Sequence, residues 1–88
     1  MIEQQVTIVN PLGLHARPAA QFVKMAAGYT SHIEILRDGA SINGKSIMGV
    51  MMLAAECGSS FIVRADGADA EAAVGALAAL IAAGFGEK

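Results

Sequence analysis

Apolar and polar residues alternate along four segments of the chain, which predicts four strands. The first strand covers residues 2–9, with Ile2, Val6 and Ile8 at alternating positions on the same side. The other three cover residues 33–36, 40–43 and 61–65. Because Asp38-Gly39 separates the second segment from the third, these two strands should form a hairpin.

Helical spacing of apolar residues predicts three helices. The first helix ends at Gly28, its expected C′ residue, and buries a stripe made of Ala19, Phe22, Val23 and Ala26. The second is short, with Ser46 as N-cap and Leu53 near its end. The third has Asp69 as its expected N-cap, and its inward face is Ala73, Leu77, Leu80 and Ile81.

The resulting order, βαββαβα, favours an α+β fold with the helices on one face of a mostly antiparallel, four-stranded sheet. The chain has 88 residues, so we expect a single domain over residues 1–88. It is 55% hydrophobic but only 5% aromatic. The core should therefore be aliphatic and rich in alanine.

Charge and composition argue against several classes of protein. The net charge is −2 and the Lys and Arg residues are scattered, whereas a nucleic-acid binder would normally carry a basic stripe. A single cysteine, Cys57, excludes an internal disulfide and fits a reducing compartment. No signal-peptide pattern opens the chain, and no uncharged stretch reaches the roughly 20 residues that a membrane span needs. We therefore expect a cytoplasmic protein without membrane insertion.

The segment Gly13-Leu14-His15-Ala16-Arg17-Pro18 carries the most informative candidate chemistry. Pro18 is tolerated only in the first helical turn, which puts His15 at or next to the N-cap. The free N–H groups and the positive helix end at that point favour anions. The helix end and Arg17 should keep the imidazole neutral before phosphoryl transfer and stabilise its phosphate afterwards. The spacing alone leaves open an ordinary N-cap beside a solvated arginine.

A second candidate segment runs from Asn43 to Met52. It places a serine, Ser46, at the start of a short helix. The methionines behind it suit an adaptable contact surface, or else they fill the core; they are Met48, Met51 and Met52.

Other patterns carry weaker chemistry. Residues 39–46 match the nucleotide-binding pattern GxxxxGK[ST], but they alternate like a strand, and the chain is too short for the parallel sheet of such enzymes. We interpret His32 as a surface histidine without a neighbouring base, and Cys57 as a bystander thiol. Three acidic residues near the start of the last helix are interpreted as turn and helix-cap residues, namely Asp66, Asp69 and Glu71. No group has metal-ligand spacing, so we expect neither a metal nor a cofactor.

Three segments together resemble one known family. They are Gly13-Leu14-His15-Ala16-Arg17-Pro18-Ala19, Lys45-Ser46-Ile47-Met48-Gly49-Val50-Met51 and Asp66-Gly67-Ala68-Asp69-Ala70. Over essentially its whole length the chain resembles the histidine-containing phosphocarriers (HPr) of the bacterial phosphoenolpyruvate-dependent phosphotransferase system. The resemblance implies an open-faced β-sandwich of four antiparallel strands with three helices on one side.

The resemblance also implies a carrier that turns over only with partner enzymes. His15 would accept a phosphoryl group on Nδ1 from phosphorylated Enzyme I and pass it to Enzyme IIA domains, with Arg17 stabilising the phosphate. Ser46 would be the serine that HPr kinase/phosphorylase modifies. The partner-docking residues would be Ala16, Ala20, Lys24, Ile47, Met48 and Met51. A carrier that exposes His15 to several partners is most simply a monomer.

The residues around Ser46 differ in part from the usual pattern of the family. Gly44 stands where many Ser46-regulated members carry a bulkier residue, and residues 43–53 also resemble carriers of the nitrogen-type branch. The alternative is thus a mainly regulatory member without sugar uptake. Lys24 and Lys45 are the main positive charges near the expected docking face, so steering toward acidic partners should be weak.

Overall fold

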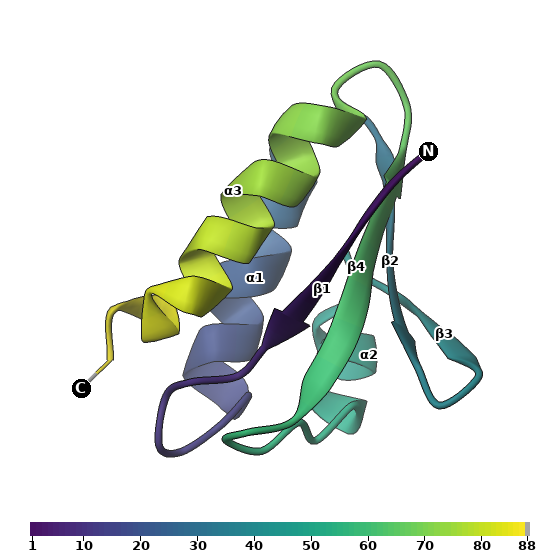
Figure 1. Cartoon of the computed structure of the whole chain (residues 1–88). Coiled ribbons are helices and arrows are strands. Elements are labelled where there is room, and N and C mark those ends of the chain that lie inside the picture. Colours follow the sequence, from purple (N-terminus) through teal and green to yellow (C-terminus); the bar gives the residue numbers. More distant parts are fainter. Residues whose placement is uncertain (88) are drawn as a thin grey trace.

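Four strands form one antiparallel sheet, and three α-helices cover one of its faces (Figure 1). The computed structural model describes residues 1–87. The elements are β1 (Ile2–Thr7), α1 (Ala16–Ala27), β2 (His32–Arg37), β3 (Ala40–Asn43), α2 (Ile47–Met52), β4 (Ser60–Asp66), α3 (Ala70–Ala82) and the 3-10 turn η1 (Gly84–Gly86). The strand order is β1-β4-β2-β3. This confirms the predicted order βαββαβα and adds η1, which was not predicted.

The core lies between the sheet and the helices. Alternate residues of β4 are buried, and they face apolar stripes on α1 and α3. Fully or almost fully buried side chains come from every layer, namely Phe22, Ile33, Ile35, Val50, Phe61, Val63, Leu77 and Ile81. The rest of the core is largely alanine and valine. Both findings confirm the aliphatic core expected from the composition.

The hairpin between β2 and β3 follows its sequence signal. Asp38 and Gly39 have φ angles of 51° and 81°, the left-handed values that a tight hairpin turn of this kind requires. The pairing of Arg37 with Ala40 closes the turn.

Several boundaries differ from the predictions. β2 and β4 each extend one residue further at both ends than the predicted ranges 33–36 and 61–65. β1 ends at Thr7 and not at residue 9, although Ile8 stays buried and bonds to the backbone of Ser59 at 2.9 Å. Of the three apolar residues that share one side of this strand, Val6 and Ile8 are buried, whereas Ile2 is 36% exposed because it is the first residue of an edge strand. Gly28 is the C-cap of α1 with a right-handed φ of −76°, so this helix ends without a left-handed C′ glycine.

Asp69 precedes α3 as predicted, but its side chain does not cap that helix. Its carboxylate accepts hydrogen bonds from the backbone N–H of Thr30 at 2.8 Å, from the N–H of Ser31 at 2.9 Å and from the Ser31 hydroxyl. Asp69 thus ties the start of α3 to the segment between α1 and β2. The Ser31 hydroxyl, followed by the Thr30 amide, lowers the pKa of Asp69 to about 2.

We expect Asp69→Asn to lower the melting temperature at neutral pH, because the amide loses these charge-assisted bonds. The pKa of Asp69 is depressed from 3.8 to about 2, so its stabilisation is complete above about pH 4 and is lost as the pH falls toward 2. Melting curves between these pH values should therefore converge for the two proteins. Asp66→Asn, a change of an exposed carboxylate in the same turn, is the control. A constant difference in melting temperature down to pH 2 would contradict this account.

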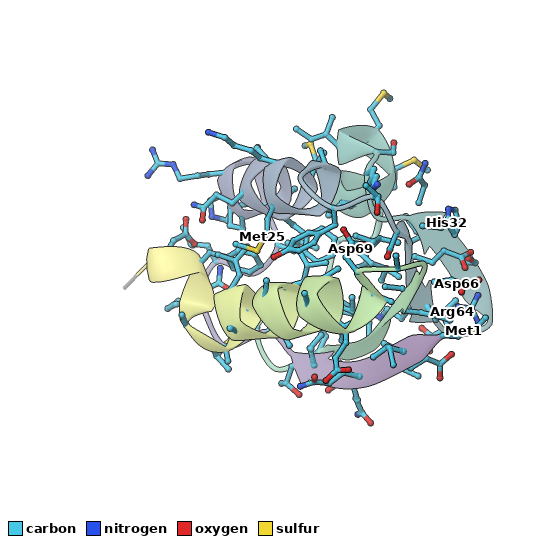
Figure 2. The ribbon with its side chains drawn as sticks, turned by 90° about the horizontal axis from the view of Figure 1, so that it is seen from above. Met1, Met25, His32, Arg64, Asp66 and Asp69 are labelled. Atoms are coloured by element: carbon cyan, nitrogen blue, oxygen red, sulfur yellow. The ribbon has the colours of Figure 1, made fainter. Side chains whose placement is uncertain are left out.

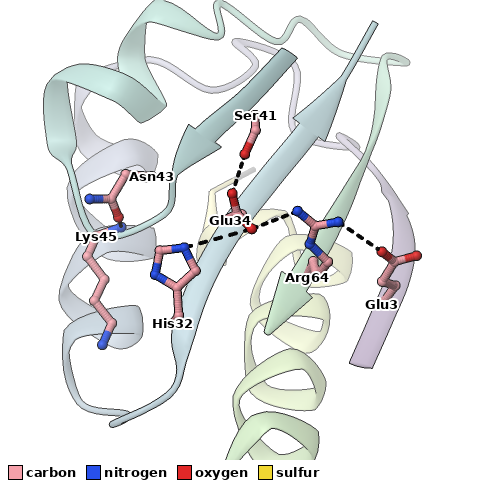
Figure 3. Close-up of polar contacts among 7 residues, drawn as sticks. All are labelled: Glu3, His32, Glu34, Ser41, Asn43, Lys45 and Arg64. Carbon is pink, nitrogen blue, oxygen red and sulfur yellow. Dashed lines mark hydrogen bonds and ion pairs between the residues drawn. The ribbon is translucent and has the colours of Figure 1, made fainter. Parts of the chain in front are cut away.

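The face of the sheet opposite the helices carries a row of charged residues (Figure 3). Arg64 on β4 lies 2.7 Å from Glu34 on β2 and 3.5 Å from Glu3 on β1. The Ser41 hydroxyl and then Arg64 lower the pKa of Glu34, whose hydrogen bond in turn raises the pKa of Arg64. These cross-strand pairs connect three strands and are structural in character.

Candidate functional site

His15 is the N-cap residue of α1, as the position of Pro18 predicted. The backbone of His15 is extended, with φ of −87°, and its side chain makes no capping hydrogen bond. His15 thus occupies the N-cap position, but its side chain does not cap the helix. The imidazole is 37% exposed and lies at the helix end where the first N–H groups lack helical partners.

Gly13 fixes the loop that leads into His15. Its φ is +71°, and an added Cβ would lie 2.7 Å from the carbonyl oxygen of Ala55 and 2.9 Å from Cα of Glu56. Only glycine fits this close approach without movement of the backbone. The next residue, Leu14, donates its N–H to Ala55 at 2.7 Å, so the loop is fastened immediately before the histidine.

Glu87 contacts the imidazole, and nothing in the sequence pattern indicated it. Nε2 of His15 lies 3.0 Å from Oε2 and 3.2 Å from Oε1 of Glu87. The carboxylate is mostly covered, with 18% of the side chain exposed. It also accepts a hydrogen bond of 2.9 Å from Nδ2 of Asn10, a residue that is 2% exposed and that donates to the Gly13 carbonyl as well. Asn10 thus connects the loop before His15, through the Gly13 carbonyl, to the carboxylate of Glu87.

The C-terminal turn explains how Glu87 reaches His15. Gly84, Phe85 and Gly86 all have left-handed φ angles, between 57° and 74°. The Phe85 side chain is buried and anchors the turn in the core. The chain therefore turns back toward the start of α1 after α3 ends, which places Glu87 beside a residue 72 positions earlier. The two glycines around an aromatic residue indicate a turn, but only the fold determines its target.

Arg17 lies on the first turn of α1 and is exposed. It lines a hollow of about 360 Å³ together with Gln21, Glu87 and parts of two loops, namely Pro11, Leu12, Phe85 and Gly86. Within residues 1–87 the guanidinium makes no ion pair. Arg17 is therefore available to an anion in this hollow, and within the described residues its guanidinium makes no hydrogen bond to the imidazole.

The arrangement around His15 favours one protonation pattern of the ring. A carboxylate against Nε2 accepts a hydrogen bond from it, so the proton of the neutral ring belongs on Nε2 and the lone pair on Nδ1. Nδ1 makes no hydrogen bond to any residue from 1 to 87. The sequence indicated only positive groups near the ring, namely the helix end and Arg17, and the structure adds the negative charge of Glu87. A nucleophilic Nδ1 at the start of α1, two residues before the exposed Arg17, is suited to carrying a phosphoryl group.

Ser46 caps α2, as predicted: its Oγ accepts a hydrogen bond of 3.2 Å from the N–H of Gly49. Gly44, two residues earlier, donates its N–H to Ile33 at 2.8 Å, and a Cβ on Gly44 would lie 2.6 Å from Cγ2 of Ile33. Glycine at position 44, where many relatives carry a bulkier residue, therefore allows the loop to lie close to β2. A bulkier residue would push the two segments apart.

The methionines behind Ser46 are exposed. Met48, Met51 and Met52 are 72%, 43% and 80% exposed, so the interpretation as core residues is wrong. Their neighbour Ile47 is 43% exposed. Ala16, Ala20 and Lys24 are likewise exposed along α1, which packs against α2. Four apolar side chains on α2 thus lie open to contact beside α1.

Lys45 was expected to provide positive charge near this surface. Its ammonium group instead donates a hydrogen bond of 2.7 Å to the carbonyl of Tyr29, just after the end of α1. The carbonyls at a helix end attract cations, which explains the contact. Of the two lysines considered, only Lys24 is left with an exposed, unpaired charge in the described part of the chain.

The structure also places the residues to which the sequence assigned no function in phosphoryl transfer. Residues 40–43 of the nucleotide-binding pattern are strand β3. His32 is exposed as expected, but Nε2 lies 3.8 Å from Oε1 of Glu34, so a neighbouring carboxylate was overlooked (Figure 3). Cys57 is exposed in a loop. Among residues 1–87 no group of His, Cys, Asp and Glu could hold a metal ion. Within the same range no helix is both long and apolar enough to span a membrane.

Comparisons with known proteins agree with this site. A family model described as "PTS HPr component phosphorylation site" matches residues 2–83. The phosphocarrier protein HPr of Cupriavidus necator is 47% identical over 87 residues, which is 99% of this chain and 98% of that protein. The HPr-like protein Crh of Halalkalibacterium halodurans is 47% identical over 92% of this chain and 96% of its own length.

Solved structures agree as well. HPr from Thermoanaerobacter tengcongensis superposes with a TM-score of 0.95 at 44% identity, covering 100% of this chain and 99% of that one. A second structure, described as an HPr dimer from the same organism, has a TM-score of 0.76 at 43% identity and covers 99% and 100% of the two chains. Family match, relatives and fold lead to one conclusion: the chain belongs to the HPr family of phosphocarrier proteins of the phosphotransferase system.

Proposed function

We propose that this chain carries a phosphoryl group on Nδ1 of His15, accepts it from phosphorylated Enzyme I and passes it to Enzyme IIA proteins. The observation that supports this most directly is the contact between Nε2 of His15 and Glu87 at 3.0 Å. It occupies one ring nitrogen and leaves the other open. In the presence of phosphoenolpyruvate and Enzyme I, one acid-labile and alkali-stable phosphate per chain is the expected product.

The transfer step follows from this geometry. The Nδ1 lone pair attacks phosphorus while the bond between phosphorus and the donor breaks, and positive charge develops on the ring. The Glu87 carboxylate stabilises that charge through the Nε2 proton. Arg17 and the start of α1 stabilise the negative phosphoryl oxygens, because both carry positive charge and lie within two residues of His15 along the chain. The reverse step returns the lone pair to Nδ1 when the acceptor attacks.

The proposed docking surface surrounds His15 on α1 and α2. Its members are exposed and mostly apolar: Ala16, Ala20, Lys24, Ile47, Met48 and Met51. Flexible methionines adapt to partners of different shape, which suits a carrier that must bind donors and acceptors in turn. Lys24 supplies a positive charge at the edge, where it steers acidic partners.

We further propose that phosphorylation of Ser46 by HPr kinase/phosphorylase weakens docking. Ser46 is partly exposed and directly precedes Ile47 and Met48. A phosphate there would place up to two negative charges beside an apolar contact surface. Ser46→Asp should lower kcat/KM for phosphorylation by Enzyme I roughly fivefold with little change in melting temperature. Ser46→Ala, which removes the cap without adding charge, is the control. Equal kcat/KM for the two variants would contradict the docking argument.

A mainly regulatory role is the second candidate, and the 47% identity to the HPr-like protein Crh favours it. A purely regulatory protein does not need a reactive histidine. The fastening of His15 by Gly13, Asn10 and Glu87 therefore favours the carrier. The labelling experiment with Enzyme I separates these two functions.

We propose a monomer as the working form, because partners must reach His15 in turn. The alternative is a dimer, as described for the relative from Thermoanaerobacter tengcongensis. Light scattering at several protein concentrations distinguishes the two.

A further inference from the structure

Two polar side chains are buried in the described part of the chain, Asn10 with 2% and Ser31 with 1% exposure. Ser31 bonds to Asp69 at the start of α3. Figure 2 shows Asp69 at the end of this helix that lies away from the yellow C-terminal turn. Asn10 instead bonds to the loop before His15 and to Glu87. Of the two buried polar groups, only Asn10 is thus in contact with the phosphoryl site.

The amide nitrogen of Asn10 connects two acceptors. Nδ2 donates to the Gly13 carbonyl at 2.7 Å and to Oε1 of Glu87 at 2.9 Å. Since a carbonyl and a carboxylate only accept, the nitrogen and not the oxygen of the amide faces both of them. Oδ1 is buried and has no hydrogen-bond partner within residues 1–87. An unpaired buried acceptor lowers stability, so an amide is not the side chain that stabilises the core best at this position. Its two donor bonds indicate a role in the site.

The loop before His15 does not depend on this amide alone. The Gly13 N–H donates to the backbone carbonyl of Asn10 at 3.0 Å, which closes the turn between these two residues. The Gly13 carbonyl also accepts the N–H of His15 at 3.0 Å. Both are backbone bonds, so loss of the Asn10 side chain should leave the loop in place.

The side chain of Glu87, by contrast, depends on Asn10. Within residues 1–87 its carboxylate accepts hydrogen bonds from Asn10 and from the partly exposed ring of His15. The backbone of Glu87 is held separately, because its N–H donates to Gly84 at 2.9 Å. A glutamate side chain loses much rotamer freedom when it is fixed in one place. Without Asn10 the carboxylate keeps one partner, the ring, and should spend less time against Nε2.

We propose that Asn10 is a positioning residue for phosphoryl transfer, which acts on His15 by holding the carboxylate of Glu87 against Nε2. The proposal rests on the proposed function of His15. With the carboxylate in place the ring proton stays on Nε2 and the lone pair on Nδ1, which is the arrangement that attacks phosphorus. A buried amide thus sets the rate of a reaction whose reacting atoms it does not contact.

The test is a double-mutant cycle with Asn10→Leu and Glu87→Ala. Leucine is close to asparagine in size and removes the unpaired oxygen together with the amide, so the fold should survive. The rate is measured in single-turnover experiments with phosphorylated Enzyme I. We expect Asn10→Leu to slow transfer about fivefold when Glu87 is present, and less than about twofold in Glu87→Ala, because two residues that act as a unit are not additive.

Ser31→Ala is the matched control, because it removes an equally buried hydrogen-bonding group at the other end of α3. It should lower the melting temperature and leave the transfer rate unchanged. Nitrogen NMR of the His15 ring supplies a measurement that reduced stability alone does not change. The fraction of the ring proton on Nδ1 should rise in Asn10→Leu and stay at the wild-type level in Ser31→Ala.

Equal slowing by Asn10→Leu with and without the Glu87 carboxylate overturns the proposal, because Asn10 then acts through the loop. An unchanged rate in the folded variant overturns it as well. If Asn10→Leu does not fold, the side-chain amide signals of Asn10 decide: they should shift in Glu87→Ala, and unchanged signals overturn the proposal. Absence of phosphorylation in the wild-type protein overturns the proposed function instead.

Discussion

Replacing His15 by alanine should abolish the phosphate that Enzyme I and phosphoenolpyruvate add to this chain. Arg17, the helix end and the hollow bind anions but offer no nucleophile, so the loss should be complete rather than partial. The chain has one other histidine, His32, which is exposed on β2 and lies 3.8 Å from Glu34. His32→Ala is thus a matched control and should be phosphorylated like the wild type.

The measurement is the stoichiometry of acid-labile, alkali-stable phosphate after complete reaction. The fold should survive in His15→Ala, because the ring is 37% exposed and makes no capping hydrogen bond, and because Glu87, its hydrogen-bond partner, keeps the bond from Asn10. An unchanged melting temperature verifies this. Phosphate of the same lability retained in His15→Ala, or lost in His32→Ala, would refute the assignment of the phosphoryl acceptor.

Local signals were sufficient to predict most of the fold. Asp38-Gly39 predicts a hairpin because two consecutive left-handed residues are needed there, and the structure has φ angles of 51° and 81° at these positions. Ser46 predicts the start of α2 because a hydroxyl can satisfy a free N–H three residues later. Pro18 restricts the start of α1, which places His15 at its N-cap. Each of these features depends on residues a few positions apart.

The missed features depend on residues far apart in the chain. Asp69 was expected to cap α3, a local role, yet its carboxylate binds Thr30 and Ser31 about 40 positions earlier. Capping propensity and this tertiary contact require the same residue type, so the sequence alone does not separate them. The exposure of Met48 and Met52 was equally undetermined, because methionine suits both cores and contact surfaces. Glu87 has no local signal for its contact with His15.

Glu87→Gln should slow phosphoryl transfer to His15 about tenfold while the chain remains folded. The amide fits the same space and can accept from Nε2, but it lacks the negative charge. A charge-assisted hydrogen bond exceeds a neutral one by roughly 1–1.5 kcal/mol, which corresponds to about a tenfold change in rate. The control is Glu71→Gln, an exposed residue in the first turn of α3 that changes the net charge equally. The rate should be measured in single-turnover experiments with phosphorylated Enzyme I.

A spectroscopic measurement separates the effect of Glu87 from a general disturbance of the site. Nitrogen NMR of the His15 ring should show the proton mainly on Nε2 in the wild type, and a larger fraction on Nδ1 in Glu87→Gln. Arg17→Ala should also slow transfer, by about tenfold or more, because the phosphoryl oxygens lose their cation. It should leave the ring protons unchanged, since the His15 ring contacts Glu87 and not Arg17 within residues 1–87. If Glu87→Gln slows transfer without moving the ring proton, Glu87 acts through the loop geometry that it shares with Asn10 and not through Nε2.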